Sequence, residues 1–154
     1  MTSRQTSLAR PRGTRLASWL TGQWSVNRAI NDHPGAFEGA ATFIADGDGR
    51  MTWHETGRLC LDAYDGPASR TLAIVPAPGV SADIWEVRFA DGRFFHPLDL
   101  TTGRCDVEHL CGPDVYAGAY TVPGQDELSV LWRVRGPGRD DTIASRYQRL
   151  DTHR

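Results

Sequence analysis

A chain of 154 residues is long enough to fold as one domain with its own core, and its 17 basic residues nearly balance its 19 acidic ones. Every basic residue is an arginine and charges of both signs are interspersed, so the composition argues against nucleic acid as a partner. No stretch approaches the roughly 18 continuous apolar residues of a membrane span, so no membrane partner is expected either.

The first 15 residues, MTSRQTSLARPRGTR, lack the apolar core of a signal peptide and are interpreted as a flexible N-terminal tail. Their richness in arginine and serine leaves an organelle presequence as the alternative. Residues 16–150 are then expected to form a single domain. The three cysteines, Cys60, Cys105 and Cys111, are too few for a secreted disulfide framework, so a cytoplasmic location is expected.

A short helical turn follows the tail, and strands follow the turn. The apolar residues of RLASWL suit one helical turn over residues 16–20, after which Gly22 interrupts and an alternating pattern begins. Alternating runs bounded by turn signals predict about ten strands, at residues 22–30, 36–44, 50–61, 70–75, 83–89, 93–100, 104–110, 115–122, 127–135 and 142–149.

This order of elements predicts an all-β fold, a closed antiparallel up-and-down β-barrel of about ten strands with a short N-terminal helix. Tight turns such as DGDG at 46–49 join most neighbours, and closure removes the exposed edges of so long a meander. The helix would plug one end. A two-sheet sandwich is the alternative, but it usually needs longer crossings, and only PAPG at 76–79 offers one.

Features of the first and last strands resemble the calycin superfamily, the lipocalins and their relatives. Gly22-Gln23-Trp24 directly follows the short helix, and arginines stand on the last strand. In that superfamily such an arginine packs across the tryptophan where the barrel closes. The resemblance therefore implies closure by Gly22, Trp24 and either Arg146 or Arg149, and Arg146 is assigned to this role.

Three further segments, GRFFHPLDL, HLCGPDVYAGAY and WRVRGPGRD, resemble an uncharacterised family of small proteins known only as a domain of unknown function. The likeness covers nearly the whole chain, from Leu20 to Arg149. It implies a lipocalin-like β-barrel. It brings no activity, substrate or catalytic residue with it.

Strand alternation places four polar side chains on otherwise apolar faces: Arg28, Glu55, His96 and His109. Such groups are costly to bury alone, so they must pair, bind water or meet a ligand. A cavity with a polar centre explains all four together. The predicted ligand-binding set is completed by Trp53, Phe94, Cys111, Tyr116 and Trp132.

Two interpretations of the polar cluster stay open. In one, Arg28 pairs with Glu55 and the histidines bond to their neighbours, so that the core is solid and the protein acts through its surface. In the other, the same groups orient a small-molecule ligand, largely apolar, that carries an anionic or carbonyl group.

Metal binding is a separate alternative, because His109 and Cys111 are two residues apart on one strand face and His96 could lie across from them. A zinc site needs three or four protein ligands, and no third ligand is fixed here. No metal and no cofactor is therefore predicted. A haem held by His96 or His109, as in some lipocalin-like barrels, is the alternative by analogy.

Catalysis in the same cavity is the remaining alternative. His96, His109 and Glu55 are candidate general acids or bases, with Arg28 stabilising developing negative charge. Such a set would suit a cofactor-independent isomerase, cyclase or lyase. The sequence does not decide whether the protein is an enzyme, and it leaves a homodimer open.

Overall fold

The computed structural model describes residues 15–79 and 83–150, and over them the chain forms one short helix and ten strands. The predicted all-β class and the helical turn at 16–20 are confirmed. The elements are α1 (Leu16–Leu20), β1 (Gly22–Ile30), β2 (His33–Ala45), β3 (Met51–Leu61), β4 (Tyr64–Pro76), β5 (Trp85–Phe89), β6 (Phe94–Leu98), β7 (Arg104–Cys111), β8 (Asp114–Gly124), β9 (Glu127–Gly136) and β10 (Arg139–Arg149).

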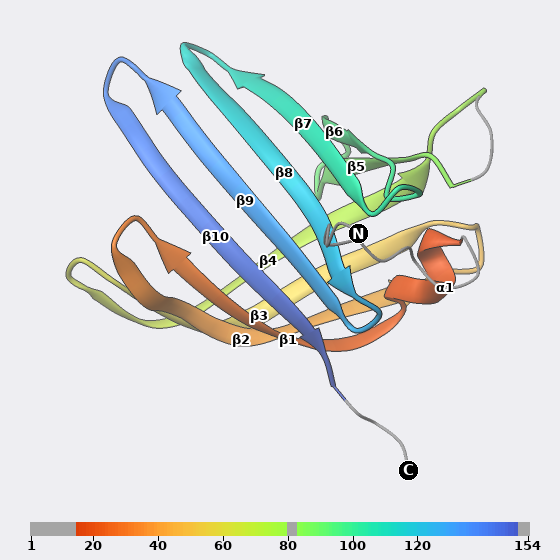
Figure 1. The fold of residues 1–154 in the computed structure, drawn as a ribbon, viewed down its shortest axis with the longest axis horizontal. Coiled ribbons are helices and arrows are strands. Elements are labelled where there is room, and N and C mark those ends of the chain that lie inside the picture. Colours follow the sequence, from red (N-terminus) through yellow and green to blue (C-terminus); the bar gives the residue numbers. More distant parts are fainter. Residues whose placement is uncertain (1–14, 80–82, 151–154) are drawn as a thin grey trace, which may run out of the picture.

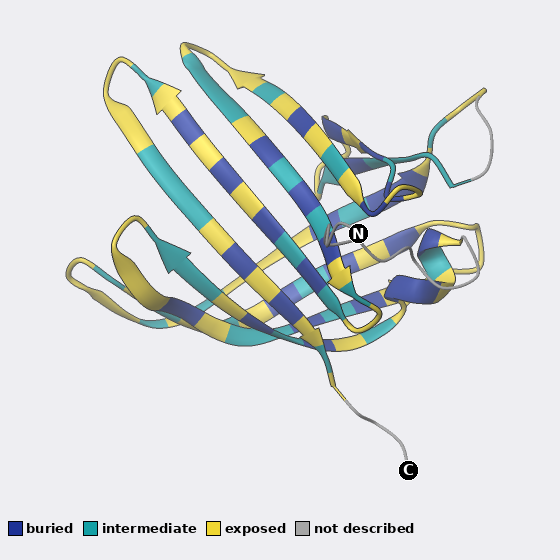
Figure 2. Ribbon diagram, in the orientation of Figure 1, coloured by how far each residue is buried: buried dark blue, intermediate teal, exposed yellow. Residues whose placement is uncertain are grey.

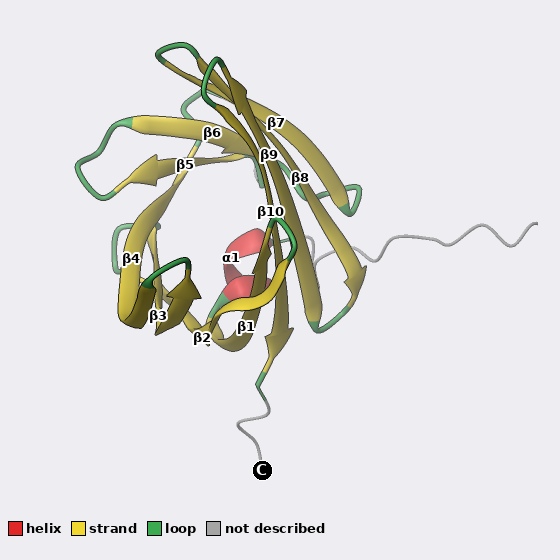
Figure 3. Ribbon diagram, turned by 90° about the vertical axis from the view of Figure 1, so that its left-hand side faces the viewer, coloured by secondary structure: helices red, strands yellow, loops and turns green. Residues whose placement is uncertain are grey.

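The strands form one antiparallel sheet in the order β6-β5-β4-β3-β2-β1-β10-β9-β8-β7. Because β1 pairs with β10, the sheet curls round until β6 approaches β7, as Figure 1 and Figure 3 show. No backbone ladder joins β6 to β7 within the described residues, so the barrel is nearly closed rather than closed. Side chains span this seam between β6 and β7: the ring of Phe95 on β6 meets that of His109 on β7 with centroids 5.0 Å apart.

The short helix α1 covers one end of the barrel. Leu16, Trp19 and Leu20 are buried and belong to the main core. The indole of Trp24 donates to the carbonyl oxygen of Leu20 (2.9 Å), and that of Trp19 donates to the carbonyl oxygen of Gln125 (2.8 Å). These bonds tie α1 to β1 and to the β8–β9 turn. Figure 3 shows the barrel from the opposite end, with α1 behind.

Buried and exposed residues alternate along β8, β9 and β10, as Figure 2 shows. This is the period of a strand with one face towards a core. In β2 and β3 the inward positions Gly39 and Gly57 stand directly opposite each other. A Cβ on Gly57 would lie 2.3 Å from the carbonyl oxygen of Glu38, so the two strands can approach this closely only without a side chain there.

The fourth strand is longer than predicted, since β4 begins at Tyr64 instead of residue 70. The segment DGPAS has the composition of a turn, yet it pairs with β3 throughout. Pro67 is tolerated because β5 pairs only with Leu72–Pro76, which leaves the first half of β4 at a sheet edge. The longer strand places Arg70 directly opposite Glu55.

Arg149, and not Arg146, packs on Trp24 where β1 meets β10. The guanidinium carbon of Arg149 lies 4.3 Å from the centroid of the Trp24 ring, and its Nη2 donates to the carbonyl oxygen of Trp19 (2.8 Å). The assignment of Arg146 is wrong because β10 turns its odd-numbered side chains inward here. Arg146 lies exposed on the outer face, opposite Asn27.

Replacing Arg149 by alanine is expected to lower the free energy of unfolding by about 1 to 2 kcal/mol, because the cation–π contact and the hydrogen bond to Trp19 are both lost. Arg146→Ala removes the same kind of side chain from the outer face and is expected to change stability by less than about 0.5 kcal/mol. Urea denaturation of the two variants measures the difference. Equal losses would contradict the assignment of closure to Arg149.

The predicted tail at residues 1–15 lies outside the described part of the chain, apart from Arg15. Within residues 15–79 and 83–150, no helix has the length and apolar character needed to cross a membrane. The three cysteines, all in the described part, carry free thiols.

Candidate functional site

Glu55 is buried inside the barrel and accepts four hydrogen bonds. Its Oε1 accepts from Nη2 of Arg28 (2.9 Å) and from Nε of Arg70 (3.0 Å). Its Oε2 accepts from the indole of Trp53 (3.0 Å) and from the hydroxyl of Tyr147. A carboxylate offers about four acceptor sites, so those of Glu55 are all taken. Glu55 therefore acts as an anchor for two arginines.

Strand register brings these groups together. Glu55 and Arg70 are directly opposite in β3 and β4, and Arg28 and Ser145 are directly opposite in β1 and β10. Nε of Arg28 donates to Oγ of Ser145 (2.7 Å), and Nη2 of Arg28 also reaches the hydroxyl oxygen of Tyr147 (3.0 Å). Side chains from four strands thus converge on one ionic network.

The two arginines keep Glu55 ionised. Burial by itself would raise the pKa of this carboxyl group, but the charges of Arg70 and Arg28 and the hydrogen bond from Tyr147 outweigh burial and lower the pKa to about 2. The Glu55 side chain is only 1% exposed, so its charge is balanced by these neighbours and not by water. The ion pair between Arg28 and Glu55, which the solid-core interpretation predicts, is present.

Glu55 does not use the full hydrogen-bonding capacity of the two arginines. Their guanidinium carbons lie over aromatic rings, Arg28 5.0 Å from the centroid of Phe37 and Arg70 5.4 Å from that of Trp53. Within the described residues, Nη1 of Arg28 and both Nη atoms of Arg70 donate to no protein acceptor. Two positive charges therefore face one negative charge, and donors remain free.

Two adjoining pockets of the barrel interior share Arg28, Ile30 and Arg70. The inner pocket, of about 200 Å³, also has apolar walls from Phe95, Tyr116, Val130, Trp132 and Ile143. The side pocket, of about 150 Å³, also has walls from Phe37, Leu59 and Ala68. The two arginines therefore stand between the two pockets.

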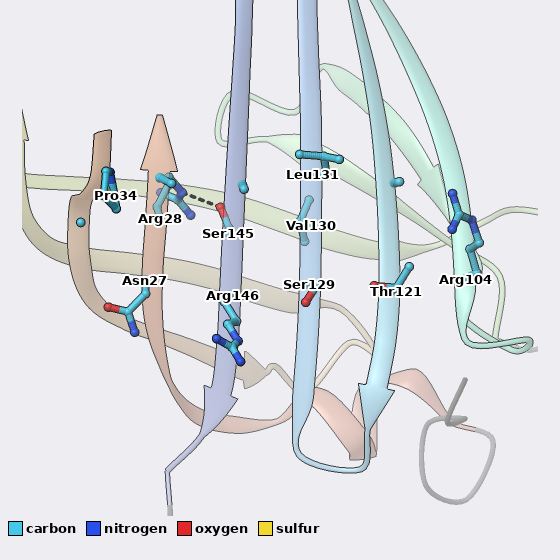
Figure 4. A pocket seen from close by; sticks show the side chains of 14 residues that line it. Asn27, Arg28, Pro34, Arg104, Thr121, Ser129, Val130, Leu131, Ser145 and Arg146 are labelled. Atoms are coloured by element: carbon cyan, nitrogen blue, oxygen red, sulfur yellow. Dashed lines mark hydrogen bonds between the residues drawn. The ribbon is translucent and has the colours of Figure 1, made fainter. Parts of the chain in front are cut away.

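A hollow of about 560 Å³ lies on the outer wall of the barrel over β1, β2 and β7–β10 (Figure 4). It shares Arg28, Val130 and Ser145 with the inner pocket, and its other walls include outward side chains such as Asn27, Ser129 and Arg146. Small-molecule sites are usually enclosed by bulky apolar and aromatic side chains. The interior pockets have such walls and are the better candidate.

His96 is fully buried inside the barrel but lines neither interior pocket. Its Nδ1 bonds to the carbonyl oxygen of Pro97 (2.7 Å) and its Nε2 to the hydroxyl of Tyr120 (3.0 Å). A carbonyl can only accept, so Nδ1 carries the proton and Tyr120 donates to Nε2. Burial lowers the pKa of His96 to about 4, although the bond to Pro97 opposes this, and His109 and Arg70 lower it further. His96 therefore ties β6 to β8 as a neutral ring.

His109 lies at the same seam, partly buried among rings. Its ring centroid is 5.0 Å from that of Phe95, 5.6 Å from Phe89 and 6.1 Å from Tyr116. It lines neither interior pocket. The structure therefore brings Arg28 and Glu55 together as the sequence suggests, and it places the two histidines apart from them.

The predicted aromatic residues of the site lie inside the barrel. Tyr116 and Trp132 line the inner pocket, with ring centroids 6.4 Å apart. Trp53 is buried beneath Arg70 and donates to Glu55. Their contact with a ligand stays a prediction.

Phe94 and Cys111 do not line the cavity, so the prediction for these two residues is wrong. A bulge in the pairing of β5 with β6 adds one residue to β6, and as a result Phe95 and His96 are both buried. Phe94 is left 46% exposed. Cys111 is exposed at the end of β7.

Three residues of the network, Arg70, Ser145 and Tyr147, are absent from the predicted set. Arg70 shares strand parity with Leu72, which would have placed it on the inner face, but the predicted strand began only at residue 70. Ser145 and Tyr147 lie on the opposite face of β10 from Arg146. The assignment of Arg146 to the inner face therefore placed both of them on the outer face in the prediction.

Within residues 15–79 and 83–150, no group of three or more His, Cys, Asp or Glu side chains is arranged to hold a metal ion. A haem on His96 would first have to break the bond of that ring to Tyr120 or to Pro97. Haem binding through His96 would therefore cost this ring one of its two bonds, and haem binding through His109 stays an untested alternative.

The fold and the site define the class of protein: a small antiparallel up-and-down β-barrel with an ionic network inside. Residues 20–149 match the model described as "Family of unknown function (DUF6314)", and the chain belongs to this family. The predicted membership of a domain-of-unknown-function family is thus confirmed. No curated protein matches the chain.

Several solved structures share the fold. The S-type phycobiliprotein lyase CPES from Guillardia theta superposes with a TM-score of 0.64 at 8% identity, over 89% of this chain and 92% of that one. A protein of unknown function from the DUF3598 family of Nostoc punctiforme gives 0.60 at 13% identity, over 94% of this chain and 50% of that one. EF1p2_mFAP2b bound to DFHBI gives 0.50 at 14%, over 89% and 98%. At such identities the likeness shows the fold alone.

Proposed function

We propose that the protein binds a small, largely apolar ligand with an anionic or carbonyl group inside the barrel. The observation that carries this proposal is the excess of positive charge from Arg28 and Arg70 over Glu55, between two pockets with apolar walls. A charge held away from water is costly unless it is paired. An oxygen of the ligand would accept from the free guanidinium nitrogens, and charge-assisted bonds of this kind are strong.

Two similar barrels support a binding role for the interior. EF1p2_mFAP2b is bound to DFHBI in its structure, and CPES is a phycobiliprotein lyase. Both agree with the binding of a small molecule inside a barrel of this size. Barrels of eight or more strands are wide enough to hold such a ligand.

Binding is preferred to catalysis because none of the predicted acids and bases is free beside the pockets. Glu55 has four hydrogen-bond partners, and His96 has both ring nitrogens engaged. His109 lines neither pocket. An isomerase, cyclase or lyase without a cofactor would need one of these groups within hydrogen-bond reach of its substrate.

The cytoplasm is the compartment in this proposal. Three free thiols, two of them exposed, suit a reducing environment. Disulfide-linked assembly has no part in the proposed function.

Native mass spectrometry of the protein as purified is the first test, because a retained organic anion would identify the ligand directly. Arg70→Gln is then expected to weaken the binding of hexanoate at least tenfold, about 1.4 kcal/mol, since it removes the more accessible of the two cations. Isothermal titration calorimetry measures the affinity. Hexanol, which has no charge, is expected to bind more weakly than hexanoate.

Arg58→Gln is the matched control, because Arg58 lies exposed on the same hairpin and pairs with Asp65. It is expected to leave the affinity for hexanoate unchanged. Equal affinities in wild type and Arg70→Gln would contradict the proposal. So would the combination of no retained ligand and no detectable binding of hexanoate.

A further inference from the structure

Resting on the function proposed above, we infer that the ligand of the inner pocket is a single-ring aromatic monocarboxylate. Three properties of the pocket lead to this class: its size, the ring systems that form one wall, and the charge that it leaves unbalanced. Each property excludes ligands that a barrel of this fold could otherwise hold.

The size of the inner pocket limits the apolar part of the ligand to about one ring. The pocket measures about 200 Å³ and the side pocket about 150 Å³. A protein cavity of roughly 150 Å³ accommodates benzene. A tetrapyrrole would not fit without displacing the core, and a long alkyl chain would have to pass between Arg28 and Arg70.

One wall of the inner pocket is built from rings with fixed orientation. Phe95 and Trp132 stack at an interplanar angle of 9°, and Phe89 stacks behind Phe95 with centroids 4.5 Å apart. Tyr116 meets the Trp132 ring nearly edge-on, at 72°, and its hydroxyl accepts from Nη1 of Arg139 (3.0 Å). Aromatic pairs in stacked or edge-on geometry gain about 0.5 to 1.5 kcal/mol beyond burial. This wall therefore favours a flat ring over an aliphatic one.

The charge of the site specifies a monoanion. Arg28 and Arg70 together exceed Glu55 by one positive charge, and one carboxylate balances that excess. Arg28 has only Nη1 free, because its Nε and Nη2 are bonded to Ser145, Glu55 and Tyr147. A planar carboxylate needs few donors, whereas a phosphate dianion would bring more charge and more acceptor oxygens than these groups serve.

Calorimetric titration of the full chain with four probes tests the class: benzoate, cyclohexanecarboxylate, benzyl alcohol and decanoate. Benzoate is expected to bind at least threefold more tightly than cyclohexanecarboxylate, which has the same charge without the aromatic ring. It is expected to bind at least tenfold more tightly than benzyl alcohol, which has the ring without the charge. Decanoate is expected to bind more weakly than benzoate.

Two pocket-filling variants locate the bound ring. Ile143→Trp narrows the inner pocket and is expected to weaken the binding of benzoate at least tenfold. Ala68→Leu narrows only the side pocket and is expected to leave the affinity within twofold of wild type. Thermal unfolding shows whether each variant is folded. If Ile143→Trp does not fold, Val130→Leu narrows the same pocket by a smaller amount and takes its place.

The outcomes separate this inference from the proposed function. Tighter binding of decanoate than of benzoate, equal binding of benzoate and cyclohexanecarboxylate, or a retained tetrapyrrole would overturn the single-ring class. If Arg70→Gln still weakened the binding of hexanoate, the broader proposal of an anionic ligand would stand. Failure of benzoate, cyclohexanecarboxylate, decanoate and hexanoate to bind, with no retained ligand, would overturn both the single-ring class and the proposed function.

Discussion

Replacing Glu55 by glutamine is expected to lower the free energy of unfolding by about 3 kcal/mol. The amide has nearly the same shape but no charge, so Arg28 and Arg70 would share the barrel interior without a counter-charge. Removing one partner of a buried ion pair typically costs roughly 3 to 5 kcal/mol, because the other charge stays buried. The lower value applies here since the Arg70 side chain is 43% exposed and water can reach it.

The pKa of Glu55 leads independently to the same magnitude. Its carboxyl group titrates at 4.5 in the ordinary case and at about 2 in the folded protein. Because the folded chain takes up this proton less readily than the unfolded chain, the stabilisation is complete above pH 4.5 and is lost as the pH falls towards 2. At 1.36 kcal/mol per pKa unit, the difference corresponds to about 3 kcal/mol.

Urea denaturation at pH 7 measures the effect. Glu38→Gln is the matched control, because Glu38 is exposed on β2 and forms no ion pair with the described residues. The double variant Glu55→Gln, Arg28→Met is expected to lose less stability than the sum of the two single variants, since it removes both charges. A loss below about 1 kcal/mol for Glu55→Gln would contradict the role of Glu55 as the anchor of the network.

Alternation alone is enough to predict that Arg28 and Glu55 point inward, because β1 pairs regularly with β2 up to Arg28, its irregularity lying between Arg28 and Ile30, and β3 pairs regularly on both sides of Glu55. The pairing of the two side chains then follows from the up-and-down strand order. To predict that Arg70 joins this network, one must also recognise that the turn-like segment before it is part of the strand. A proline and a glycine there are tolerated only because that part of β4 has a free edge, which is a property of the whole sheet.

Two features that no alternating pattern reveals account for the other differences. The bulge in β6 shifts the parity by one residue, and from the sequence Phe94 and Phe95 are equivalent candidates for the core. In β10 the residues between Ile143 and Arg149 are mostly small or polar, so burial preference does not decide which parity faces inward. There the register with β1, which pairs Trp24 with Arg149, decides it.

The stability of the protein is expected to fall by about 3 kcal/mol between pH 6.5 and pH 4 because of His96. Burial holds its pKa at about 4 in the folded protein, compared with an ordinary value of 6.5. Over this interval the unfolded chain binds the proton and the folded chain does not, so acid favours unfolding. Protonation of the folded state would place a hydrogen on Nε2, facing the Tyr120 hydroxyl that now donates to this nitrogen. The Tyr120 hydroxyl would then have to accept instead of donate, and a charged ring would replace a neutral one in a buried site.

Urea denaturation of wild type and His96→Gln from pH 7 to pH 4.5 isolates this contribution, since the loss due to Glu55 begins only below pH 4.5. Wild type is expected to lose most of the 3 kcal/mol within that range, about 2 kcal/mol or more, and His96→Gln much less, because an amide does not titrate. His33→Gln is the matched control and keeps the loss, since it removes an exposed histidine of β2 and leaves His96 and its neighbours in place. Parallel pH profiles for wild type and His96→Gln would show that His96 is not held neutral at the seam.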